Sequence, residues 1–574
     1  MQKGVPQIMD VTSIKSILHY LTNEIIPSKF EAAQQPEQNT IQICFRGINN
    51  INWLEVSWQG DCARILRIDR PEKAGSNSTL AQQLSYGLKY MALVSIKQDK
   101  FERVIKLEFA KKPGDEVSKY LIIELMGKHS NLFYLDKNLR IIAAGKQIKA
   151  NQSSYRTIAT GDIYTEPPQS IKKEPSEMES FDNWKNNISI IPQSLKKNLI
   201  ANYQGVSPIL INQIEHFASI SSDQLMNKSI ETIEDKDLKE IFRIWKLWIK
   251  RFNNNNFNYS IFNNYFYCVW FPEDKEKNQK SINLADEISL YYSNFLELKK
   301  TEALINKIDG IIFKQINIEK KNFNIQNKLL INSQNHEIYK LKADNIFLKI
   351  DLKKTNIIEA EKLYKKAKKL KRARILIQER LNIHTNKIER LEEFGSLLDN
   401  LSSLNIESNK IKLTLLEELK DEVSAEFNIK IKTSKISKKK SIDIKSLPIE
   451  IYSPQKLMIQ IGRNMRQNDL ISFKLSRKGD LWFHAQECPG SHVILKSSAK
   501  DANENDIQLA ADIASFFSRA KGNIKVPINC VKIKDLQKIS KSGMGCVSFK
   551  NQELIWGNPS RGKEYIKKNT HDKK

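Results

Sequence analysis

The stretch from Leu284 to Val423 limits the possible folds most, because its apolar residues recur at alternating spacings of four and three. This heptad period is typical of helices that pack along a continuous seam. One seam consists of Leu304, Ile308, Ile311, Gln315, Ile318, Asn322, Ile325 and Leu329. A second consists of Leu363, Ala367, Leu370, Arg374, Ile377, Leu381, His384, Ile388, Leu391 and Leu398. Each seam needs a partner, so residues 284–423 are predicted to form two long helices.

The segment between the two seams, from Leu341 to Ile357, has mixed polarity and contains residues that break helices. We therefore expect the second helix to fold back on the first as an antiparallel coiled-coil arm. At a rise of about 1.5 Å per residue, helices of roughly 50 to 60 residues would extend about 80 to 90 Å. The polar seam residues Gln315 and Asn322 are expected to fix the register at a cost in stability.

The chain is strongly basic and too long for one hydrophobic core. Its 574 residues carry a formal net charge of +26, which favours a polyanionic partner, either nucleic acid or an anionic membrane surface. It has no run of about 18 apolar residues, and its first residues lack the apolar core of a signal peptide, so we expect a cytoplasmic protein without a membrane segment. The 6 cysteines form no CxxC pair, so neither a zinc site nor a disulfide framework is expected.

Sequence patterns divide the chain into the modules of a multi-domain α+β protein. They are an N-terminal α+β module (1–168), a helix-hairpin-helix region (180–255), the antiparallel coiled-coil arm (284–423) and a C-terminal α+β module (452–560). In the first we expect helices at 12–25 and 78–90, and strands at 40–46, 53–58, 92–97, 103–110, 120–125 and 131–135. In the last we expect strands at 458–461, 470–475, 481–485 and 492–496, and a helix at 503–519. The Pro-rich, charged segment 167–179 is a predicted linker.

The helix-hairpin-helix region centres on the run Gly205-Val206-Ser207-Pro208, in which Ser207 is a predicted N-cap and Pro208 the first helical residue. Backbone N–H groups at such a helix start can hold a phosphate. The same run also suits a well-capped corner between two helices. Both interpretations remain open on the sequence.

Two stretches of the C-terminal module contain candidate RNA-binding residues. One is the polar, turn-like run from Gly462 to Asp469, and the other is Leu481 to Ala485, where Trp482 and His484 share one face of a predicted strand. An aromatic ring and an imidazole beside Arg463 and Arg466 would suit RNA, but a tryptophan on a strand is also a common core residue. His484 and His492 have no third ligand or nucleophile at readable spacing, so no metal site, cofactor or catalysis is expected.

Basic residues gather in two places near the arm. One run, at Lys362, Lys365, Lys366, Lys368, Lys369, Lys371, Arg372 and Arg374, lies on the second predicted helix. It is either a solvated helix face or a set of phosphate contacts, and the scarcity of flanking acids favours RNA. The other run, between Lys430 and Lys440, has no helical seam and is predicted to be a solvated linker or basic strap.

Several motifs together resemble the NFACT family, whose bacterial members are of the RqcH type. The run Leu125 to Leu132 (LMGKHSNL) resembles the hallmark of the family's N-terminal module. Gly462 to Asn464 (GRN), Asp480 to Ala485 (DLWFHA) and Pro489 to Val493 (PGSHV) resemble its C-terminal RNA-binding module. Gly205 to Pro208 is similar to the family's helix-hairpin-helix, and Lys365 to Ala373 to the basic part of its coiled coil. The resemblance covers nearly the whole chain.

The resemblance implies a ribosome quality-control factor that binds large ribosomal subunits obstructed by peptidyl-tRNA. Such a factor recruits alanyl-tRNA, and the nascent chain gains an untemplated alanine tail that marks it for degradation. Expected partners are the large subunit and its rRNA, alanine tRNA, peptidyl-tRNA and an RqcP-type small RNA-binding protein. Peptide transfer would be done by the ribosome, so the chain is expected not to be an enzyme.

The resemblance also implies site residues. Those expected to bind tRNA are Glu102, Arg103, Glu124, Leu125 and Met126. Those expected to contact RNA are Lys128, His129, Arg463, Asn464, Arg466, Trp482, His484, Ser491, His492, Lys365, Lys366, Lys368 and Lys369. Glu102 stands where the family pattern has Asp, which keeps the charge and adds one methylene group. From spacing alone, Arg103 would more readily belong to a structural ion pair within the N-terminal module, and only the resemblance favours a tRNA contact.

Two other classes of protein remain as alternatives. A helix-hairpin-helix accompanies some DNA- or RNA-processing enzymes, but no paired carboxylates or activated nucleophile can be identified in the sequence. A fibronectin-binding surface adhesin would need an export signal, and the N-terminus is expected to contain none.

Overall fold

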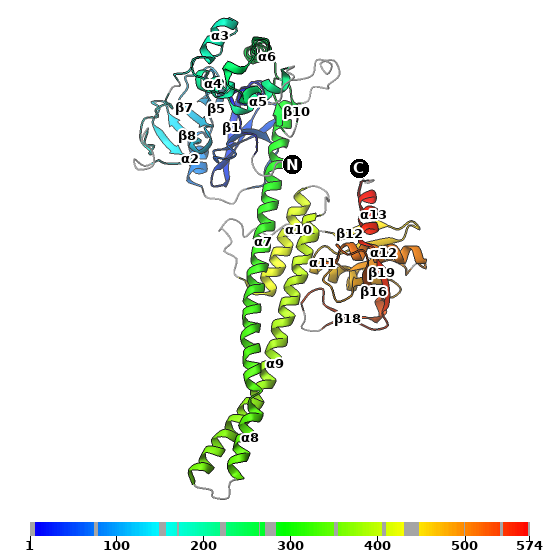
Figure 1. The fold of residues 1–574 in the computed structure, drawn as a ribbon. Coiled ribbons are helices and arrows are strands. Elements are labelled where there is room, and N and C mark those ends of the chain that lie inside the picture. Colours follow the sequence, from blue (N-terminus) through cyan, green and yellow to red (C-terminus); the bar gives the residue numbers. More distant parts are fainter. Residues whose placement is uncertain are drawn as a thin grey trace. The chain divides into compact units, whose positions relative to one another are not determined.

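The computed structural model (Figure 1) describes all residues except 1–5, 74–77, 149–155, 169–170, 219–224, 263–264, 270–282, 349–353, 404–408, 430–446, 499, 540–542 and 572–574. The described residues form two compact units, one up to Phe295 and one from Leu296 onward. The mixed α+β class predicted from the sequence is confirmed. The basic run between Lys430 and Lys440 lies outside the described residues. No helix among the described residues is long and apolar enough to cross a membrane.

The first unit is built on a nine-stranded antiparallel sheet with the order β4-β3-β2-β1-β5-β6-β7-β8-β9. Its strands are β1 (Ser28–Glu37), β2 (Thr40–Arg46), β3 (Ile51–Ser57), β4 (Arg64–Ile68), β5 (Ala92–Gln98), β6 (Val104–Ala110), β7 (Lys119–Glu124), β8 (Asn131–Asp136) and β9 (Ile141–Ala144). Its helices are α1 (Val11–Ile25) and α2 (Thr79–Gly87). The eight elements predicted here form close to their expected positions. The sequence missed β1, β4 and β9.

A helical region with its own core completes the first unit. It contains α3 (Phe181–Ile188), α4 (Leu195–Asn202), α5 (Pro208–Phe217), α6 (Asp235–Asn253) and a hairpin of β10 (Ser260–Phe262) and β11 (Tyr265–Tyr267). The core is rich in tryptophan, because Trp184, Trp245 and Trp248 are fully buried in it. Val11 of α1 and Phe101, which precedes β6, belong to the same core, so the helical region packs against one end of the sheet.

The second unit begins with helices that run antiparallel (Figure 1). They are α7 (Leu284–Ser333), whose first turns belong to the first unit, α8 (His336–Phe347), α9 (Lys354–Ser403) and α10 (Asn409–Glu426). Successive residues along α7 and α8 contact residues that come progressively earlier in α9. Ile308 shares a core with Leu391, Glu319 contacts His384, and Tyr339 lies against Lys366. The predicted antiparallel return is therefore confirmed. The predicted interruption at 341–357 is partly wrong, because α7 already ends at Ser333 and residues 341–347 are helical.

The seam on α9 agrees with the prediction at every position except Arg374, which is exposed. The seam on α7 differs from the prediction. Ile318, Ile325 and Leu329 are exposed, whereas Ile312 and Glu319 are buried. Parts of the seam therefore lie one residue later than predicted. The cause is that the charged Glu319 faces inward, whereas an apolar pattern assigns that position to its neighbour Ile318.

Glu319 forms a polar cluster inside this seam. Its Oε1 accepts a hydrogen bond from Gln315 Nε2 (3.3 Å) and lies 3.6 Å from Lys387 Nζ, while its Oε2 lies 2.6 Å from His384 Nδ1. Removing one partner of a buried polar pair is costly, whereas replacing the pair by apolar residues is often neutral or stabilising. We therefore expect the register-setting role predicted for Gln315 to be shared by a cluster centred on Glu319.

We expect Glu319→Ala to lower the free energy of unfolding by about 1–3 kcal/mol, because it leaves His384 facing an apolar seam without its acceptor. Glu319→Leu combined with His384→Leu is expected to raise the melting temperature above that of the parent, because it extends the apolar seam. Chemical and thermal denaturation of the full chain measure both effects. A lower melting temperature for the double variant would show that the cluster stabilises the helix pair rather than setting its register.

The C-terminal part of the second unit is a six-stranded antiparallel sheet with the order β12-β13-β15-β14-β16-β19. Its strands are β12 (Ile449–Tyr452), β13 (Met458–Ile461), β14 (Leu481–Ala485), β15 (Val493–Leu495), β16 (Val526–Lys532) and β19 (Glu553–Gly557). The remaining elements are α11 (Met465–Asp469), α12 (Glu504–Phe516), α13 (Pro559–His571) and a hairpin of β17 (Leu536–Lys538) and β18 (Val547–Phe549). One face of the sheet packs on α12, and residues of the β17–β18 hairpin pack on the other.

The predicted strand at 470–475 is wrong. Asn464 caps α11 by accepting a hydrogen bond from the backbone N–H of Gln467 (2.8 Å), and the helix continues through a π-helical turn at Leu470–Lys474. An N-cap of this kind starts a helix, and the short apolar run that follows fits either structure. The six cysteines are free thiols in the structure; four are buried, and Cys488 and Cys546 are half-buried.

Candidate nucleic-acid interface

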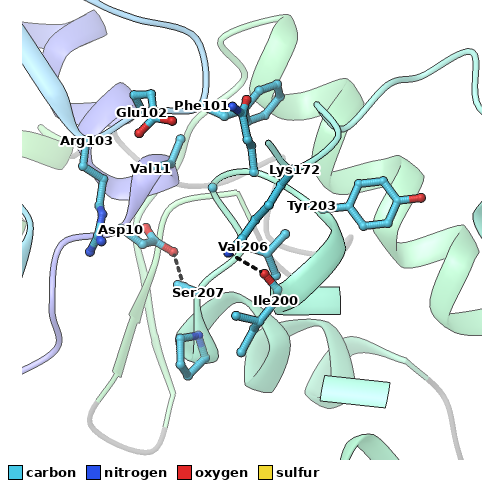
Figure 2. Close-up of a pocket in the computed structure, with 13 residues that line it drawn as sticks. Asp10, Val11, Phe101, Glu102, Arg103, Lys172, Ile200, Tyr203, Val206 and Ser207 are labelled. Carbon is cyan, nitrogen blue, oxygen red and sulfur yellow. Dashed lines mark hydrogen bonds between the residues drawn. The ribbon is translucent and has the colours of Figure 1, made fainter. Parts of the chain in front are cut away.

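Residues from three parts of the first unit line a cavity of about 350 Å³ (Figure 2). They come from the start of α1, the turn before β6, and the segment around the α4–α5 connection. The lining residues are Asp10, Val11, Phe101, Glu102, Arg103, Lys172, Ile200, Tyr203, Gln204, Gly205, Val206, Ser207 and Pro208. The cavity therefore joins the predicted Glu102-Arg103 element to the predicted helix-hairpin-helix, which are about 100 residues apart in the chain.

The α4–α5 connection has the predicted form. Ser207 is the N-cap of α5 and accepts a hydrogen bond from the backbone N–H of Leu210 (3.0 Å), with Pro208 at the first helical position. Gly205 has a φ of +71°, and a Cβ there would lie 3.1 Å from Phe101 Cβ. Glycine is thus needed both for the turn and for the close approach to the segment that carries Arg103.

A second helix begins at the same cavity. Asp10 is the N-cap of α1, accepting from the backbone N–H of Ser13 (2.9 Å), and its other carboxylate oxygen accepts from Ser207 Oγ (3.0 Å). The two capping residues therefore hold the starts of α1 and α5 side by side. Helix N-termini carry partial positive charge, although Asp10 offsets this at α1, so the start of α5 is the better anion site.

Arg103 is the cationic group of this cavity with the fewest contacts. Its guanidinium extends toward Asp10 in Figure 2, yet no hydrogen bond or ion pair joins its side chain to another described residue. Burial lowers the pKa of Arg103, and the nearby carboxylates of Asp10 and Glu102 act in the opposite direction. The structural ion pair that spacing alone suggested for Arg103 is therefore not formed with any described residue. A partly buried guanidinium without a bonded carboxylate is suited to an incoming anion.

Two further groups shape the cavity. Burial raises the pKa of Glu102, while Arg103 acts to lower it. Lys172 Nζ donates to the backbone carbonyl of Ile200 (2.8 Å), which brings a second cation to the α4 side. The sequence reasoning missed Asp10 and Lys172. The N-cap pattern before the first amphipathic helix would have identified Asp10. Lys172 lies in the predicted linker, and no sequence motif distinguishes it there.

The other residues assigned to tRNA lie elsewhere. Glu124 is fully buried at the end of β7, where it pairs with Arg156 and accepts a hydrogen bond from Tyr164 Oη (2.8 Å). Leu125 is buried too, and its backbone N–H donates to the carbonyl of Arg103 (2.9 Å). Neither side chain is accessible, so their expected direct contact with tRNA is corrected: Glu124 bonds to Arg156 and Tyr164, and only the backbone of Leu125 is bonded to Arg103. Met126 is half-buried.

The exposed residues of this motif are Lys128 and His129, in the 3-10 turn Gly127–His129. They are accessible to a ligand, but neither lines the cavity. Gly60 approaches this turn closely, because a Cβ on it would lie 2.9 Å from Lys128 Cα. Their assignment to RNA stays a prediction.

The expectation that Trp482 offers a surface for a base is wrong. Trp482 is only 1% exposed and belongs to a core with Ile494, Val531 and Leu536. His484 stacks on it, with ring centroids 5.5 Å apart, and the buried His492 meets its ring edge-on at 5.2 Å. Burial lowers the pKa of both histidines below the ordinary value, so neither supplies a cation at neutral pH.

The Gly462–Asn464 run connects the C-terminal sheet to α10 instead of facing solvent. Asn464 is buried and its Nδ2 donates to Glu418 Oε2 (2.8 Å), while the buried Arg463 donates to the backbone carbonyl of Leu447. Ser491 is buried as well. The expected RNA contacts of Arg463, Asn464, Ser491 and His492 are therefore corrected to structural roles. Of this group only Arg466 is exposed.

Glu422 of α10 completes this connection. It is buried, and its carboxylate oxygens accept hydrogen bonds from the backbone N–H groups of Met465 and Arg466 (both 3.1 Å) at the start of α11. Burial raises the pKa of Glu422 to about 7, although the two backbone bonds act to lower it. The protonated form therefore favours folding.

Because the pKa of an unfolded glutamate is about 4.3, the stabilising contribution of Glu422 is complete below about pH 4 and is lost as the pH rises toward 7. We expect Glu422→Gln to flatten the dependence of the unfolding free energy on pH between about pH 5 and pH 7. Urea denaturation of parent and variant across this range measures the slope. Equal slopes would contradict the assignment.

The basic run on α9 is accessible. Lys365, Lys366, Lys368 and Lys369 are exposed, and Lys366 Nζ lies 4.1 Å from the ring centroid of Tyr339 on α8. Among the described residues, no group of three or more His, Cys, Asp or Glu side chains is arranged to hold a metal ion.

Comparisons with known proteins agree with this arrangement. The NFACT N-terminal and middle domains match residues 10–350, and the NFACT protein RNA binding domain matches residues 449–551. The chain is 26% identical over 480 residues to the Rqc2 homolog RqcH of Bacillus subtilis (strain 168), covering 78% of this chain and 79% of that protein. It is 24% identical over 579 residues to the Rqc2 homolog RqcH of Streptococcus pneumoniae serotype 2 (strain D39 / NCTC 7466), covering 95% and 97%.

A solved structure, the C-terminal part of the fibronectin/fibrinogen-binding protein from Streptococcus suis, aligns with 47% of this chain and 99% of its own length. Its sequence identity is 23% and its TM-score 0.39, a value too low to support an argument about function. The family match, in contrast, spans more than half of the chain. The chain therefore belongs to the NFACT family, and the relatives that it matches over most of their length are of the RqcH type.

Proposed function

We propose that this protein is a ribosome quality-control factor that recruits tRNA to obstructed large ribosomal subunits through the cavity around Arg103. The observation that carries the proposal is the partly buried guanidinium of Arg103, which has no bonded partner among the described residues. It lies in one cavity with the capped start of α5. Family membership and the RqcH-type relatives support the same role.

The chemistry of the cavity suits a nucleic-acid strand. A guanidinium fork can bind a phosphate or a guanine edge with two hydrogen bonds, and helix N–H groups add donors for a phosphate. A volume of about 350 Å³ falls at the lower end of the range for small-ligand sites, which is about 300–1,000 Å³. It fits one element of a tRNA, such as a phosphate with its nucleoside, rather than a helix. Glu102 beside Arg103 can accept a hydrogen bond from a base amino group.

The rest of the chain contributes binding to the ribosome in this proposal. The exposed lysines of α9 neutralise rRNA phosphates, and the C-terminal module adds RNA contacts. The recruited tRNA carries alanine, and the ribosome itself transfers it to the stalled chain. The protein acts without a cofactor and is not an enzyme, and an RqcP-type small RNA-binding protein joins the complex.

Sequencing of the RNA that co-purifies with the tagged full chain tests this proposal. We expect large-subunit rRNA together with tRNA dominated by alanine isoacceptors. Recovery of genomic DNA would favour a nucleic-acid-processing enzyme. Recovery of no nucleic acid, with binding to fibronectin instead, would favour an adhesin. Either outcome would overturn the proposal.

A further inference from the structure

We propose that the C-terminal sheet carries a second RNA site, in which an unpaired nucleotide stacks on Trp556 and hydrogen-bonds to Asn529. This site is built by β14, β16 and β19 in the second unit, so it is distinct from the Arg103 cavity of the first. It would hold a single-stranded segment, because a base must leave its helix to stack on a protein ring.

Strand pairing defines the face on which this site lies. His484 pairs with Asn529, Asn529 pairs with Leu554, and Pro527 pairs with Trp556. Side chains at paired positions of neighbouring strands point to the same side of a sheet. Phe483, Cys530 and Ile555 alternate with them and lie in the core that packs on α12. The proposed site therefore faces away from α12.

Only part of this face is covered. Near Trp482, side chains of the β17–β18 hairpin pack on it, including Leu536 and Phe549. Toward β19 the face is open, because Leu554 is 50% exposed and Trp556 is 55% exposed. An exposed tryptophan on a sheet face, beside a second exposed apolar side chain, is the arrangement on which RNA-binding sheets stack bases.

Asn529 supplies an independent sign of a ligand. It is only 4% exposed, yet its Oδ1 has no hydrogen-bond partner among the described residues. Buried polar atoms are almost always paired, because leaving one unpaired costs free energy. Asn529 lies between the half-buried His484 and the exposed Leu554. A base stacked on Trp556 could bring its exocyclic amino group to this oxygen.

RNA fits the open face better than an added protein strand. Gln508 of α12 already donates to the backbone carbonyl of Trp556 (2.8 Å), so part of the hydrogen-bonding capacity of β19 is used within the chain. The exposed Lys525 precedes β16 and the exposed Lys550 lies between β18 and β19, which suits a polyanion. Residues 449–551 of this module match the family's RNA binding domain.

Titration of the full chain with a labelled single-stranded RNA and with the matched duplex tests the proposal. We expect the single strand to bind more tightly, and Trp556→Ala to weaken its binding by at least about fivefold, since stacking on an aromatic residue contributes strongly to each bound base. Trp556→Phe should retain most of the affinity. Tyr452→Ala removes an exposed aromatic side chain from β12, the opposite edge strand, and should change nothing.

Intrinsic fluorescence separates this site from other RNA contacts of the chain. Single-stranded RNA should quench the parent's tryptophan emission, and Trp556→Phe should remove that change while Tyr452→Ala leaves it intact. Asn529→Leu should reduce any preference for adenine or cytosine over uracil, because uracil has no amino group. Equal single-strand affinity of parent and Trp556→Ala would overturn the proposal, and so would quenching that survives in Trp556→Phe.

Discussion

Arg103→Ala is expected to abolish the co-purification of tRNA while leaving the unfolding free energy within about 0.5 kcal/mol of the parent. The expectation of unchanged stability follows from the structure, since no hydrogen bond or ion pair of the side chain is lost. The loss of tRNA follows from the guanidinium fork, because no other group in the cavity can form the same two-bonded contact. Quantifying tRNA and rRNA in the purified material measures both parts, with rRNA expected to remain.

Two further variants make this result interpretable. Arg103→Lys keeps the charge without the fork and should bind tRNA weakly, between the parent and Arg103→Ala. Arg140→Ala removes an equal charge from an exposed position in the same unit and should leave tRNA binding unchanged. If Arg103→Ala unfolded, or still carried tRNA at the parental level, the assignment of this cavity would have to be withdrawn.

Arg390→Ala is expected to destabilise the second unit by about 1.5–3 kcal/mol, because it removes a buried guanidinium that is hydrogen-bonded to two half-buried carboxylates. Arg390 is buried, and its guanidinium donates to Glu426 Oε1 through Nε (2.6 Å) and to Glu393 Oε2 through Nη1 (2.5 Å). It also donates to the backbone carbonyl of Met544. One side chain thus joins α9, α10 and the segment before β18.

Denaturant unfolding of the full chain measures this effect. Arg46→Ala is the matched control, because Arg46 forms an exposed ion pair with Glu31 (2.7 Å) and such pairs contribute about 0–1 kcal/mol. Arg390→Lys should restore only part of the stability, since an ammonium group cannot make the same set of bonds. A loss below about 1 kcal/mol for Arg390→Ala would show that the network is not needed to join these elements.

Local patterns predicted much of the fold. Heptad spacing located α7 and α9 and their antiparallel return, and alternating apolar residues located most strands of the first sheet. Errors arose where a polar side chain faces inward. Glu319 shifts the α7 seam by one residue, and the N-cap Asn464 begins a helix where apolar alternation favoured a strand. Neither contact can be read from the spacing of apolar residues.

The candidate site was only partly predictable. The capped corner at Ser207 follows from local rules, and Arg103 was singled out by resemblance, but nothing local indicates that the two share a cavity. Asp10 joins them through its bond to Ser207, a contact across 197 residues. In the C-terminal module, motif residues such as Trp482 and Asn464 are buried, whereas the exposed Trp556 lies outside every motif. A residue that belongs to a family motif is therefore not necessarily accessible to a ligand.

The measurement that tests the account most directly is a reconstituted tailing reaction. It combines purified large subunits carrying peptidyl-tRNA, alanyl-tRNA and the full chain, with mass spectrometry of the nascent peptide as the readout. The account predicts a ladder of added alanine residues that requires the protein and disappears with Arg103→Ala, while that variant still sediments with the subunits. An unextended peptide in the presence of the bound parent protein, or an equal ladder with Arg103→Ala, would contradict it.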